Sequence, residues 1–331
     1  MKPPYFWSSE LDPKSREAAP VTRALLTPVS ALYGAALGWK LARAQPHRAG
    51  PGVICVGNLT VGGVGKTPVV AAIRARLAGL GLRAASLSRG YGGRLKGPLR
   101  IDPARHDAGD VGDEPVMLAA GGEAWISRDR PTGAEAMDAA GVEVLVMDDG
   151  HQNPSLHKDL SILVIDAGAP FGNGHLLPKG PLREPVARGL ARCDAIVLMG
   201  EGACPDTVSA AGRPVLRARL EPRLAPPPGA LVAFAGIGRP QKFFDSLAAA
   251  GAELSETVPY PDHHAYSAKE TDWLERLAGE RGARLVTTEK DHVRLDGQMR
   301  ERVLAWPVEA CFEDDAALDA LLAPFADRRT P

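Results

Sequence analysis

A glycine-rich segment between an apolar strand and a helix is the feature that most constrains the fold of this chain. Residues 53–56 read Val-Ile-Cys-Val, and residues 60–67 read Thr-Val-Gly-Gly-Val-Gly-Lys-Thr. Pro68 then favours the start of a helix. Glycines let the backbone curl so that successive N–H groups and the helix N-terminus face an anion. The order of strand, glycine loop and helix therefore predicts a phosphate-binding loop in a parallel α/β sheet.

The residue types of this loop fit ATP with Mg²⁺. Lys66 is expected to reach the β- and γ-phosphates, and the Thr67 hydroxyl is expected to ligate the metal. Thr60 stands where the usual pattern GxxxxGK[ST] has its first glycine, so the match is not strict. Together with Thr60, Lys66 and Thr67, the other loop residues are predicted to bind the nucleotide: Val61, Gly62, Gly63, Val64 and Gly65.

A second element of the phosphate site is predicted where an apolar strand ends in two acids. Residues 144–149 read Val-Leu-Val-Met-Asp-Asp. Adjacent carboxylates at the end of a strand are costly unless a cation or hydrogen bonds compensate, and ligands of open parallel sheets bind at that edge. We therefore predict that Asp148 or Asp149 holds the metal, and the sequence leaves open which of the two contacts it.

Apolar runs recur between helical stretches, which is typical of a parallel sheet with helices on both faces. A proline-rich break at residues 221–229 predicts a domain boundary. We expect an N-terminal segment at 1–48, a core of the P-loop NTPase type at 49–221, and a smaller α/β domain at 222–331. The expected core strands cover residues 52–56, 83–87, 143–147, 161–165, 195–199 and 215–220.

Composition excludes several classes of protein. The net charge of -1 gives no bias toward nucleic acid. The four cysteines form no CxxC pair and have no histidine at metal-ligand spacing, which argues for reduced thiols rather than a disulfide frame or a zinc site. The largely polar first 17 residues do not fit a cleavable export signal.

Residues 25–39 contain no charged side chain and are flanked by Arg23 and Lys40. The stretch is short for a membrane span, and it fits either an interfacial helix or a helix packed on the core. The residues alone slightly favour the core helix.

Six further strings, taken with the loop, resemble the tetraacyldisaccharide 4'-kinase family, the lipid A kinases of Gram-negative bacteria. The likeness runs in order from about Tyr5 to Arg294 and covers most of the chain. The strings are SRGYGG at 88–93, GDEP at 112–115, DDGHQ at 148–152, FGNGHLLPKGPLREP at 171–185, DHH at 262–264 and TTEKD at 287–291.

The resemblance implies transfer of the γ-phosphoryl group of ATP to the 4'-hydroxyl of a lipid A disaccharide 1-phosphate, which gives lipid IVA. It also implies a peripheral enzyme on the cytoplasmic face of the bacterial inner membrane, whose partners are the lipid substrate and the membrane surface. No nucleic acid and no obligate protein partner are implied. For such an enzyme, residues 25–39 are better interpreted as a membrane-docking helix than as a core helix.

The family's catalytic aspartate falls on Asp113, and its partner histidine falls on His263, with His264 as the less favoured register. The resemblance implies that Asp113 orients or deprotonates the sugar hydroxyl, while His263 holds that carboxylate from the second domain. Taken alone, GDEP would predict a helix start with Asp113 as its cap, and DHH would predict a surface loop.

Substrate contacts are implied for residues in three of the strings: Arg89, Tyr91, Gln152, Arg183 and Glu184. Asn153 stands where the family typically has histidine, and an asparagine cannot become a cation. For TTEKD we expect structural support rather than a chemical role.

The alternative function is a membrane-cycling P-loop ATPase switch. Such ATPases carry a further lysine early in the loop, where this chain has Val61. A GTPase would need an [NT]KxD string, and a kinase of soluble sugars would have little use for an apolar helix. Acyl-chain preference and oligomeric state do not follow from the sequence.

Overall fold

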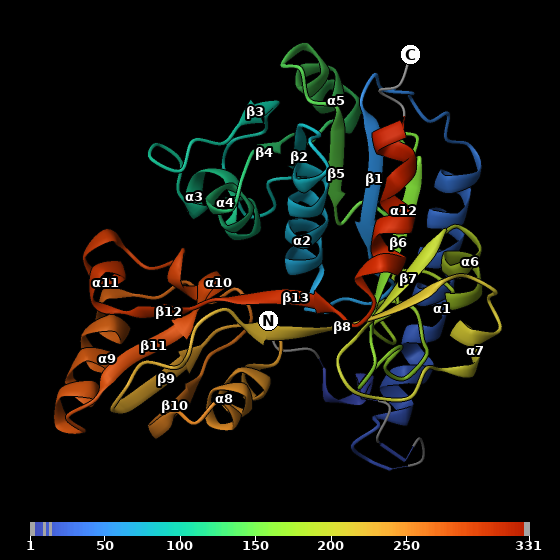
Figure 1. Ribbon diagram of the computed structural model, residues 1–331. Helices are drawn as coiled ribbons and strands as arrows, with labels where there is room; N and C mark the ends of the chain where they lie inside the picture. Colours follow the sequence, from blue (N-terminus) through green and yellow to red (C-terminus); the bar gives the residue numbers. More distant parts are fainter. Residues whose placement is uncertain (1–3, 9–10, 13–14, 328–331) are drawn as a thin grey trace.

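A nine-stranded, mostly parallel sheet forms the core of the molecule (Figure 1). The computed structural model describes residues 4–8, 11–12 and 15–327. The strand order is β13-β8-β7-β6-β1-β5-β2-β4-β3, and only the edge strands β13 and β3 pair antiparallel. The strands are β1 (Gly52–Gly57), β2 (Ala84–Ser88), β3 (Leu99–Arg100), β4 (Ala124–Ile126), β5 (Val144–Asp148), β6 (Leu160–Asp166), β7 (Ala195–Met199), β8 (Val215–Pro222) and β13 (Val308–Phe312).

Helices cover both faces of this sheet, as the sequence predicted. Ile54 and Val56 of β1 pack in one cluster with α2 (Lys66–Gly79), α4 (Asp113–Ala120) and α12 (Asp315–Asp327). Val53 and Cys55 point to the other face, because side chains alternate along a strand, and pack with α5 (Arg130–Ala139). Two short helices, α6 (Val186–Ala191) and α7 (Asp206–Ser209), pack in a third cluster with β6 and β7. Strands buried on both faces explain the continuous apolar runs.

A four-stranded parallel sheet of order β10-β9-β11-β12 forms the second domain. Its hydrophobic residues divide into two clusters, one with Phe243, Phe244 and Leu247, the other with Leu274 and Met299. The elements are β9 (Ala230–Ala235), α8 (Pro240–Ala249), β10 (Glu253–Pro259), α9 (Ala268–Glu280), β11 (Arg284–Thr288), α10 (Glu289–His292), α11 (Gly297–Arg302) and β12 (Leu304–Trp306).

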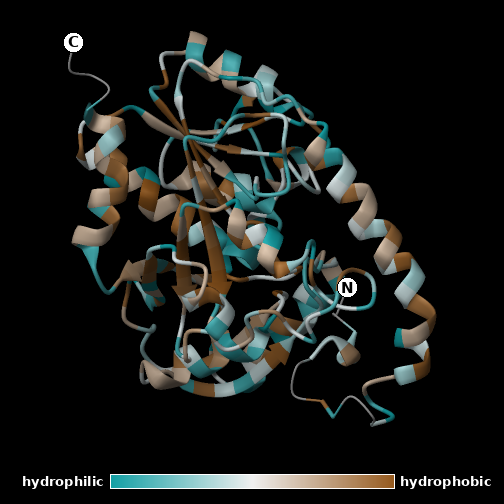
Figure 2. Cartoon of the chain, turned by 90° about the vertical axis from the view of Figure 1, so that its right-hand side faces the viewer, coloured by the Kyte–Doolittle hydropathy of each residue, from teal (hydrophilic) through white to brown (hydrophobic). Residues whose placement is uncertain are grey.

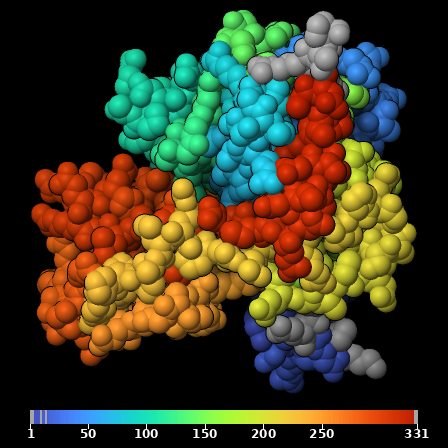
Figure 3. Space-filling view, in the orientation of Figure 1, coloured from blue at the N-terminus to red at the C-terminus, as the bar shows by residue number. Residues whose placement is uncertain are grey.

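The boundary expected for the second domain needs a correction at its C-terminal end. The chain leaves the core along β8 and returns along β13, which pairs with β8 through Ala310 and Leu220 (Figure 1). It ends in α12, which lies against α2 (Figure 3). The guanidinium of Arg76 on α2 donates to both oxygens of Asp319, at 2.5 and 2.7 Å. Residues 308–327 therefore belong to the core. The proline run at residues 221–229 marks only the place where the chain leaves the core, so it could not predict that the chain comes back.

The apolar N-terminal stretch forms part of α1 (Pro20–Ala42), which lies along one side of the molecule (Figure 2). Two small residues of α1, Ser30 and Gly34, face the segment around Leu176 and allow a close approach. Ser30 Oγ donates to Leu176 O at 3.0 Å. A Cβ on Gly34 would lie 2.7 Å from the Leu176 side chain. The opposite side exposes Val21, Leu25, Val29, Leu32 and Trp39.

These exposures show that α1 is not a core helix. Leu25 and Leu32 are each 72% exposed. None of the described helices combines the length and the apolar character needed to cross a membrane. Docking of α1 on a membrane surface stays a prediction. The remaining helical elements are η1 (Tyr5–Trp7) and α3 (Ala108–Val111).

Candidate active site

The glycine-rich loop joins β1 to α2 at the carboxyl edge of the core sheet. Gly65 has φ of 85°, in the left-handed region that favours glycine, and α2 starts at Lys66. The loop is braced on its outer side, where Val61 N donates to Pro181 O at 2.9 Å. Asn58 Nδ2 donates to Thr60 O at 2.6 Å. The local sequence thus forms the strand, loop and helix junction that phosphate binding requires.

Lys66, Asp149 and Arg183 form one ion-pair cluster beside the loop. Lys66 Nζ lies 3.5 Å from Asp149 Oδ1, and Arg183 Nη1 donates to the two Asp149 oxygens at 2.9 and 2.8 Å. Arg183 is placed by its own backbone, because its N–H donates to Leu59 O at 2.7 Å. Burial raises the pKa of Asp149, but the charges of Lys66 and Arg183 lower it more, so the net pKa lies below the ordinary value.

Asp148 has no such partner. Its side chain is buried at the end of β5, and Oδ1 has no hydrogen-bond partner among the described residues. Burial and the neighbouring charge of Glu114 raise the pKa of Asp148 to about 7, although Lys66 opposes the shift. Buried Arg130 supports the strand end by donating to Asp148 O at 3.2 Å. A buried carboxylate oxygen without a hydrogen-bond partner among the described residues suits a hard cation such as Mg²⁺.

A complete metal cage made of side chains is not present: the described residues hold no group of three or more His, Cys, Asp or Glu placed for a metal. Proteins commonly supply Mg²⁺ with one or two oxygen ligands and leave the others to phosphates and water. Thr67 and Asp148 fit that pattern.

Asp113 starts α4 and contacts residues of the second domain. Its Oδ2 accepts from His263 Nδ1 at 3.1 Å and from Arg294 Nε at 2.9 Å, and Arg294 Nη2 is also bonded to it. Its Oδ1 accepts from Glu114 N at 2.9 Å. Lys290 Nζ lies 3.4 Å from His263 Nε2. The GDEP string therefore does start a helix, although Gly112 rather than Asp113 is the cap residue, and it also joins the two domains.

The cations around Asp113 control its ionisation. Burial raises the pKa of the Asp113 carboxyl, but the hydrogen bond from His263 and the charges of Lys290 and Arg294 outweigh burial. The net pKa is well below the ordinary value. Asp113 is therefore an anion at neutral pH and a weak base in this geometry.

Arg294 is held by a buried polar group of the second domain. Its Nη1 donates to Asp291 Oδ1 and to Gly236 O, both at 2.9 Å. Asp291 is fully buried and also accepts from Tyr266 Oη at 2.9 Å and from Thr288 Oγ1 at 2.7 Å. Because each of these groups has partners, the guanidinium is fixed in its position against Asp113.

Apart from Arg183, which pairs with Asp149, the residues implied to contact substrate fall into two groups. Arg89 and Tyr91 follow β2 and are exposed, and the Tyr91 ring lies edge-on to His263 with centroids 6.2 Å apart. Gln152 and Glu184 instead contact each other at 2.9 Å, and Glu184 is fully buried against Arg192. This places Glu184 behind the site, as support for Gln152, and its direct contact with substrate stays a prediction.

Comparison with known proteins agrees with this geometry. A family model described as LpxK, tetraacyldisaccharide-1-P 4'-kinase, matches residues 22–326. The chain belongs to the tetraacyldisaccharide 4'-kinase family. It is 65% identical over 328 residues to the tetraacyldisaccharide 4'-kinase of Hyphomonas neptunium, covering 99% of both chains. It is 53% identical over 334 residues to that of Maricaulis maris, covering 99% of this chain and 97% of the relative.

A solved structure of this kinase family has the same fold. The crystal structure of the "apo" form of LpxK from Aquifex aeolicus in complex with ATP superimposes with a TM-score of 0.74 at 28% identity. The match covers 92% of this chain and 99% of that chain. Both the mostly parallel α/β core and the family assignment made from the strings are thereby confirmed.

Two positions left open by the family strings have defined surroundings in this kinase. His263 reaches Asp113, whereas His264 stacks on Tyr260 at 4.6 Å and pairs with Glu270 at 3.0 Å. Asn153 closes a turn, because its Oδ1 accepts from Ser155 N and Oγ at 2.9 and 2.7 Å. The asparagine is thus used locally as a turn residue.

The sequence reasoning missed Lys290 and Arg294 as site residues. The TTEKD string was assigned to structural support, yet its Lys290 contacts Glu114 and His263, while its Asp291 holds Arg294. The signal in the sequence was the run of charged residues 289–291, which directly follows an apolar strand. Lys290 and its partner Glu114 are 176 positions apart in the chain, and Arg294 and Asp113 are 181 positions apart, so the sequence could not identify these pairs.

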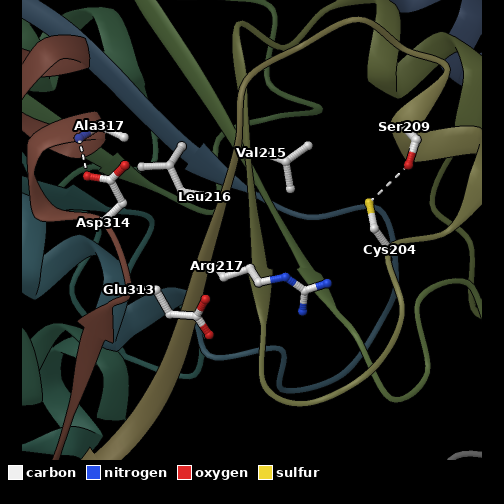
Figure 4. A pocket seen from close by; sticks show the side chains of 8 residues that line it. All are labelled: Cys204, Ser209, Val215, Leu216, Arg217, Glu313, Asp314 and Ala317. Atoms are coloured by element: carbon white, nitrogen blue, oxygen red, sulfur yellow. Dashed lines mark hydrogen bonds between the residues drawn. The ribbon is translucent and has the colours of Figure 1, made fainter.

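A cavity of about 530 Å³ lies elsewhere, between the start of β8 and the segment that joins β13 to α12 (Figure 4). It contains none of the residues predicted for the site. Its lining residues are Cys204, Ser209, Val215, Leu216, Arg217, Glu313, Asp314 and Ala317. We assign the chemistry to the sheet edge, because the convergent charged groups and shifted pKa values lie there.

Proposed function

We propose that this kinase transfers the γ-phosphoryl group of ATP directly to the 4'-hydroxyl of a lipid A disaccharide 1-phosphate. The observation that carries the proposal is the placement of Asp113 near the phosphate loop. Helix α4, which starts at Asp113, packs against α2, which starts at Lys66 of the loop, and the charges of Lys66 and Glu114 both act on Asp148. Phosphoryl transfer needs such an arrangement, since its catalysis rests on positioning and charge stabilisation.

On the nucleotide side, the loop amides and Lys66 bind the phosphates, and Thr67 with Asp148 would hold Mg²⁺. A bound Mg²⁺ would supply positive charge that offsets the negative charge of the phosphates. Asp148 suits the metal better than Asp149, because Asp149 already pairs with Lys66 and Arg183. Asp149 then serves to hold both cations at the phosphates.

On the acceptor side, Asp113 orients the sugar hydroxyl for in-line attack. The lowered pKa of Asp113 suits an orienting anion better than a strong base. A largely dissociative transition state does not require the hydroxyl to lose its proton early. His263 fixes the carboxylate from the second domain. We assign contacts with the sugar and its lipid phosphate to Arg89 and Tyr91, which are exposed, and the contact of the Tyr91 ring with His263 supports this.

We place the enzyme on the cytoplasmic face of the bacterial inner membrane, with α1 as its docking helix. The exposed apolar residues of α1 support this, because they form one face while Ser30 and Gly34 pack on the protein. The family's lipid substrate supports it as well, and the ATP used by the reaction is cytoplasmic.

The membrane proposal is tested with Leu25→Glu and Leu32→Glu, with Leu224→Glu as the matched control. Leu224 is 63% exposed and lies in the link to the second domain. We expect the two α1 variants to lose binding to anionic vesicles and activity on vesicle-embedded lipid, with activity in detergent micelles retained. Equal losses in vesicles and micelles would instead give α1 a folding role.

The activity is tested by incubating the protein with γ-labelled ATP and a lipid A disaccharide monophosphate in mixed micelles. Wild type should label the lipid, whereas Lys66→Ala and Asp113→Ala should not. Release of phosphate to water alone, with unlabelled lipid, would overturn the kinase proposal and favour a membrane-cycling ATPase.

A further inference from the structure

The second domain contacts the core sheet on both sides of the phosphate loop. On the β2 side lies the Asp113 cluster. On the β6 side, Asp166 accepts from Arg239 Nη1 at 2.9 Å and from Lys242 Nζ at 3.0 Å, both from the start of α8. β1, which leads into the loop, lies between β6 and β5 in the sheet. None of the family strings contains these three residues.

The contact on the β6 side lies directly beside the loop. Asp166 is the last residue of β6 and pairs with Met199 of β7. A Cβ on Gly65 would lie 3.4 Å from the Met199 side chain. From the other domain, a Cβ on Gly238 would lie 3.5 Å from the Gly63 backbone nitrogen. The residue after Gly238 is Arg239, so its backbone begins within a few ångströms of the loop amides.

The charges in this contact do not balance. The Asp166 side chain is 5% exposed and carries one negative charge, whereas its two partners carry one positive charge each. Among these three residues one positive charge is therefore in excess, and a further carboxylate near this contact is that of Asp262, whose Oδ2 would lie 3.7 Å from a Cβ on Gly238. The side chains of Arg239 and Lys242 are 40% and 57% exposed, so both have room to turn toward a ligand. Asp166 is fixed instead, with Oδ1 also accepting from Gly168 N at 2.9 Å.

The loop itself offers few free cations for a triphosphate. Lys66 shares its charge with Asp149 at 3.5 Å, and Arg183 also pairs with Asp149. A nucleoside triphosphate carries about four negative charges at neutral pH, and charge that develops during transfer is stabilised by arginine and lysine placed at the phosphates. Cations supplied from the facing domain would complete the site.

We propose that Arg239 and Lys242 bind the polyphosphate chain of the nucleotide from the second domain, and that Asp166 holds the pair beside the loop before nucleotide binds. The inference rests on the proposed kinase function and on nucleotide binding at the phosphate loop. Nucleotide binding then draws the second domain to the core on the β6 side. His263 and Arg294 belong to the same domain, so this contact also helps to keep them at Asp113.

The test measures the affinity of the full chain for Mg·ATP and for inorganic triphosphate, which has no base or sugar. The variants are Arg239→Ala, Lys242→Ala and their double, with Arg239→Lys as the conservative change. Arg281→Ala is the matched control, since Arg281 pairs with Glu256 within the second domain at 3.1 Å. We expect the double variant to bind both probes at least about ten-fold more weakly, Arg239→Lys to keep most of the affinity, and Arg281→Ala to match wild type.

Asp166→Asn separates phosphate binding from a simple domain contact. Asparagine keeps an acceptor for Gly168 N but removes the charge that competes with phosphate for the two cations. We therefore expect unchanged or tighter binding of both probes. Weakening equal to that of the double variant would overturn the proposal, because it would show that the ion pairs only hold the domains together. Melting temperatures near that of wild type would show that each variant folds.

Lys66→Ala distinguishes failure of this inference from failure of the proposed function. If Lys66→Ala abolishes binding and the Arg239 and Lys242 variants bind normally, only the inference is wrong. If Lys66→Ala also binds normally, the nucleotide site itself is misplaced, and both are wrong.

Discussion

Two buried aspartates of the same site, Asp148 and Asp113, have opposite electrostatic surroundings. Asp148 ends a core strand with one oxygen unpartnered among the described residues, and burial raises its pKa to about 7. Asp113 is also buried, but cations of the second domain hold its pKa below the ordinary value. The comparison teaches that burial alone does not decide the role of a carboxylate. Asp148 has an oxygen without a partner among the described residues, which suits the metal ligand that we propose, whereas Asp113 already has its cations and depends on the second domain to supply them.

The largest expected effect comes from neutralising Asp148. Asp148→Asn should lower kcat by about 10³-fold and abolish the dependence of ATP affinity on Mg²⁺, because the amide keeps the shape but loses the anionic ligand. Asp149→Asn is the matched control at the neighbouring position. It should remove the ion pairs that hold Lys66 and Arg183, and it should leave the dependence of ATP affinity on Mg²⁺ largely unchanged. Steady-state kinetics across a Mg²⁺ titration measure both. If Asp149→Asn shows the larger loss of Mg²⁺ dependence, the two aspartates exchange roles.

An intermediate effect is expected from Arg294→Gln, which tests whether the cations give Asp113 its character. Without the guanidinium the pKa of Asp113 rises, since burial is no longer opposed by Arg294. Asp113 then becomes protonated at higher pH, so the acid limb of the kcat/KM profile should move up in pH. We expect a loss of about 10–100-fold near neutral pH, largely restored by Arg294→Lys. An unmoved acid limb with a lowered melting temperature would leave Arg294 with a structural role only.

The smallest expected effect concerns stability. A carboxyl whose pKa is lowered by folding contributes stability above its unfolded pKa, near 3.9, and that contribution is lost as pH falls toward the folded value. Asp113→Asn should therefore melt below wild type at pH 7, and the difference should narrow as pH falls through 4 toward 3. Differential scanning calorimetry from pH 7 to 3 measures it. A constant difference would contradict the lowered pKa of Asp113.

Local sequence signals predicted the core side of the site well. The loop at residues 60–67, the strand ending in Asp148 and the helix starting at Asp113 all appear where short patterns placed them. Such patterns succeed because a glycine turn, an apolar strand and a helix start are each set by neighbouring residues. The course of the chain after Trp306 was not predicted, because the pairing of β13 with β8 depends on contacts across about 90 residues.

The sequence by itself determined the α/β core, the phosphate loop, the acids at the strand ends and, through the family strings, the pairing of Asp113 with a histidine. Only the tertiary structure decided that the histidine is His263, that Asp148 rather than Asp149 has an unpartnered oxygen, and that Arg294, Arg239 and Lys242 meet the core. The physical reason is the distance along the chain over which each feature is determined. Backbone geometry is set within a few residues, whereas the charge next to a carboxylate is set by whichever distant segment packs against it.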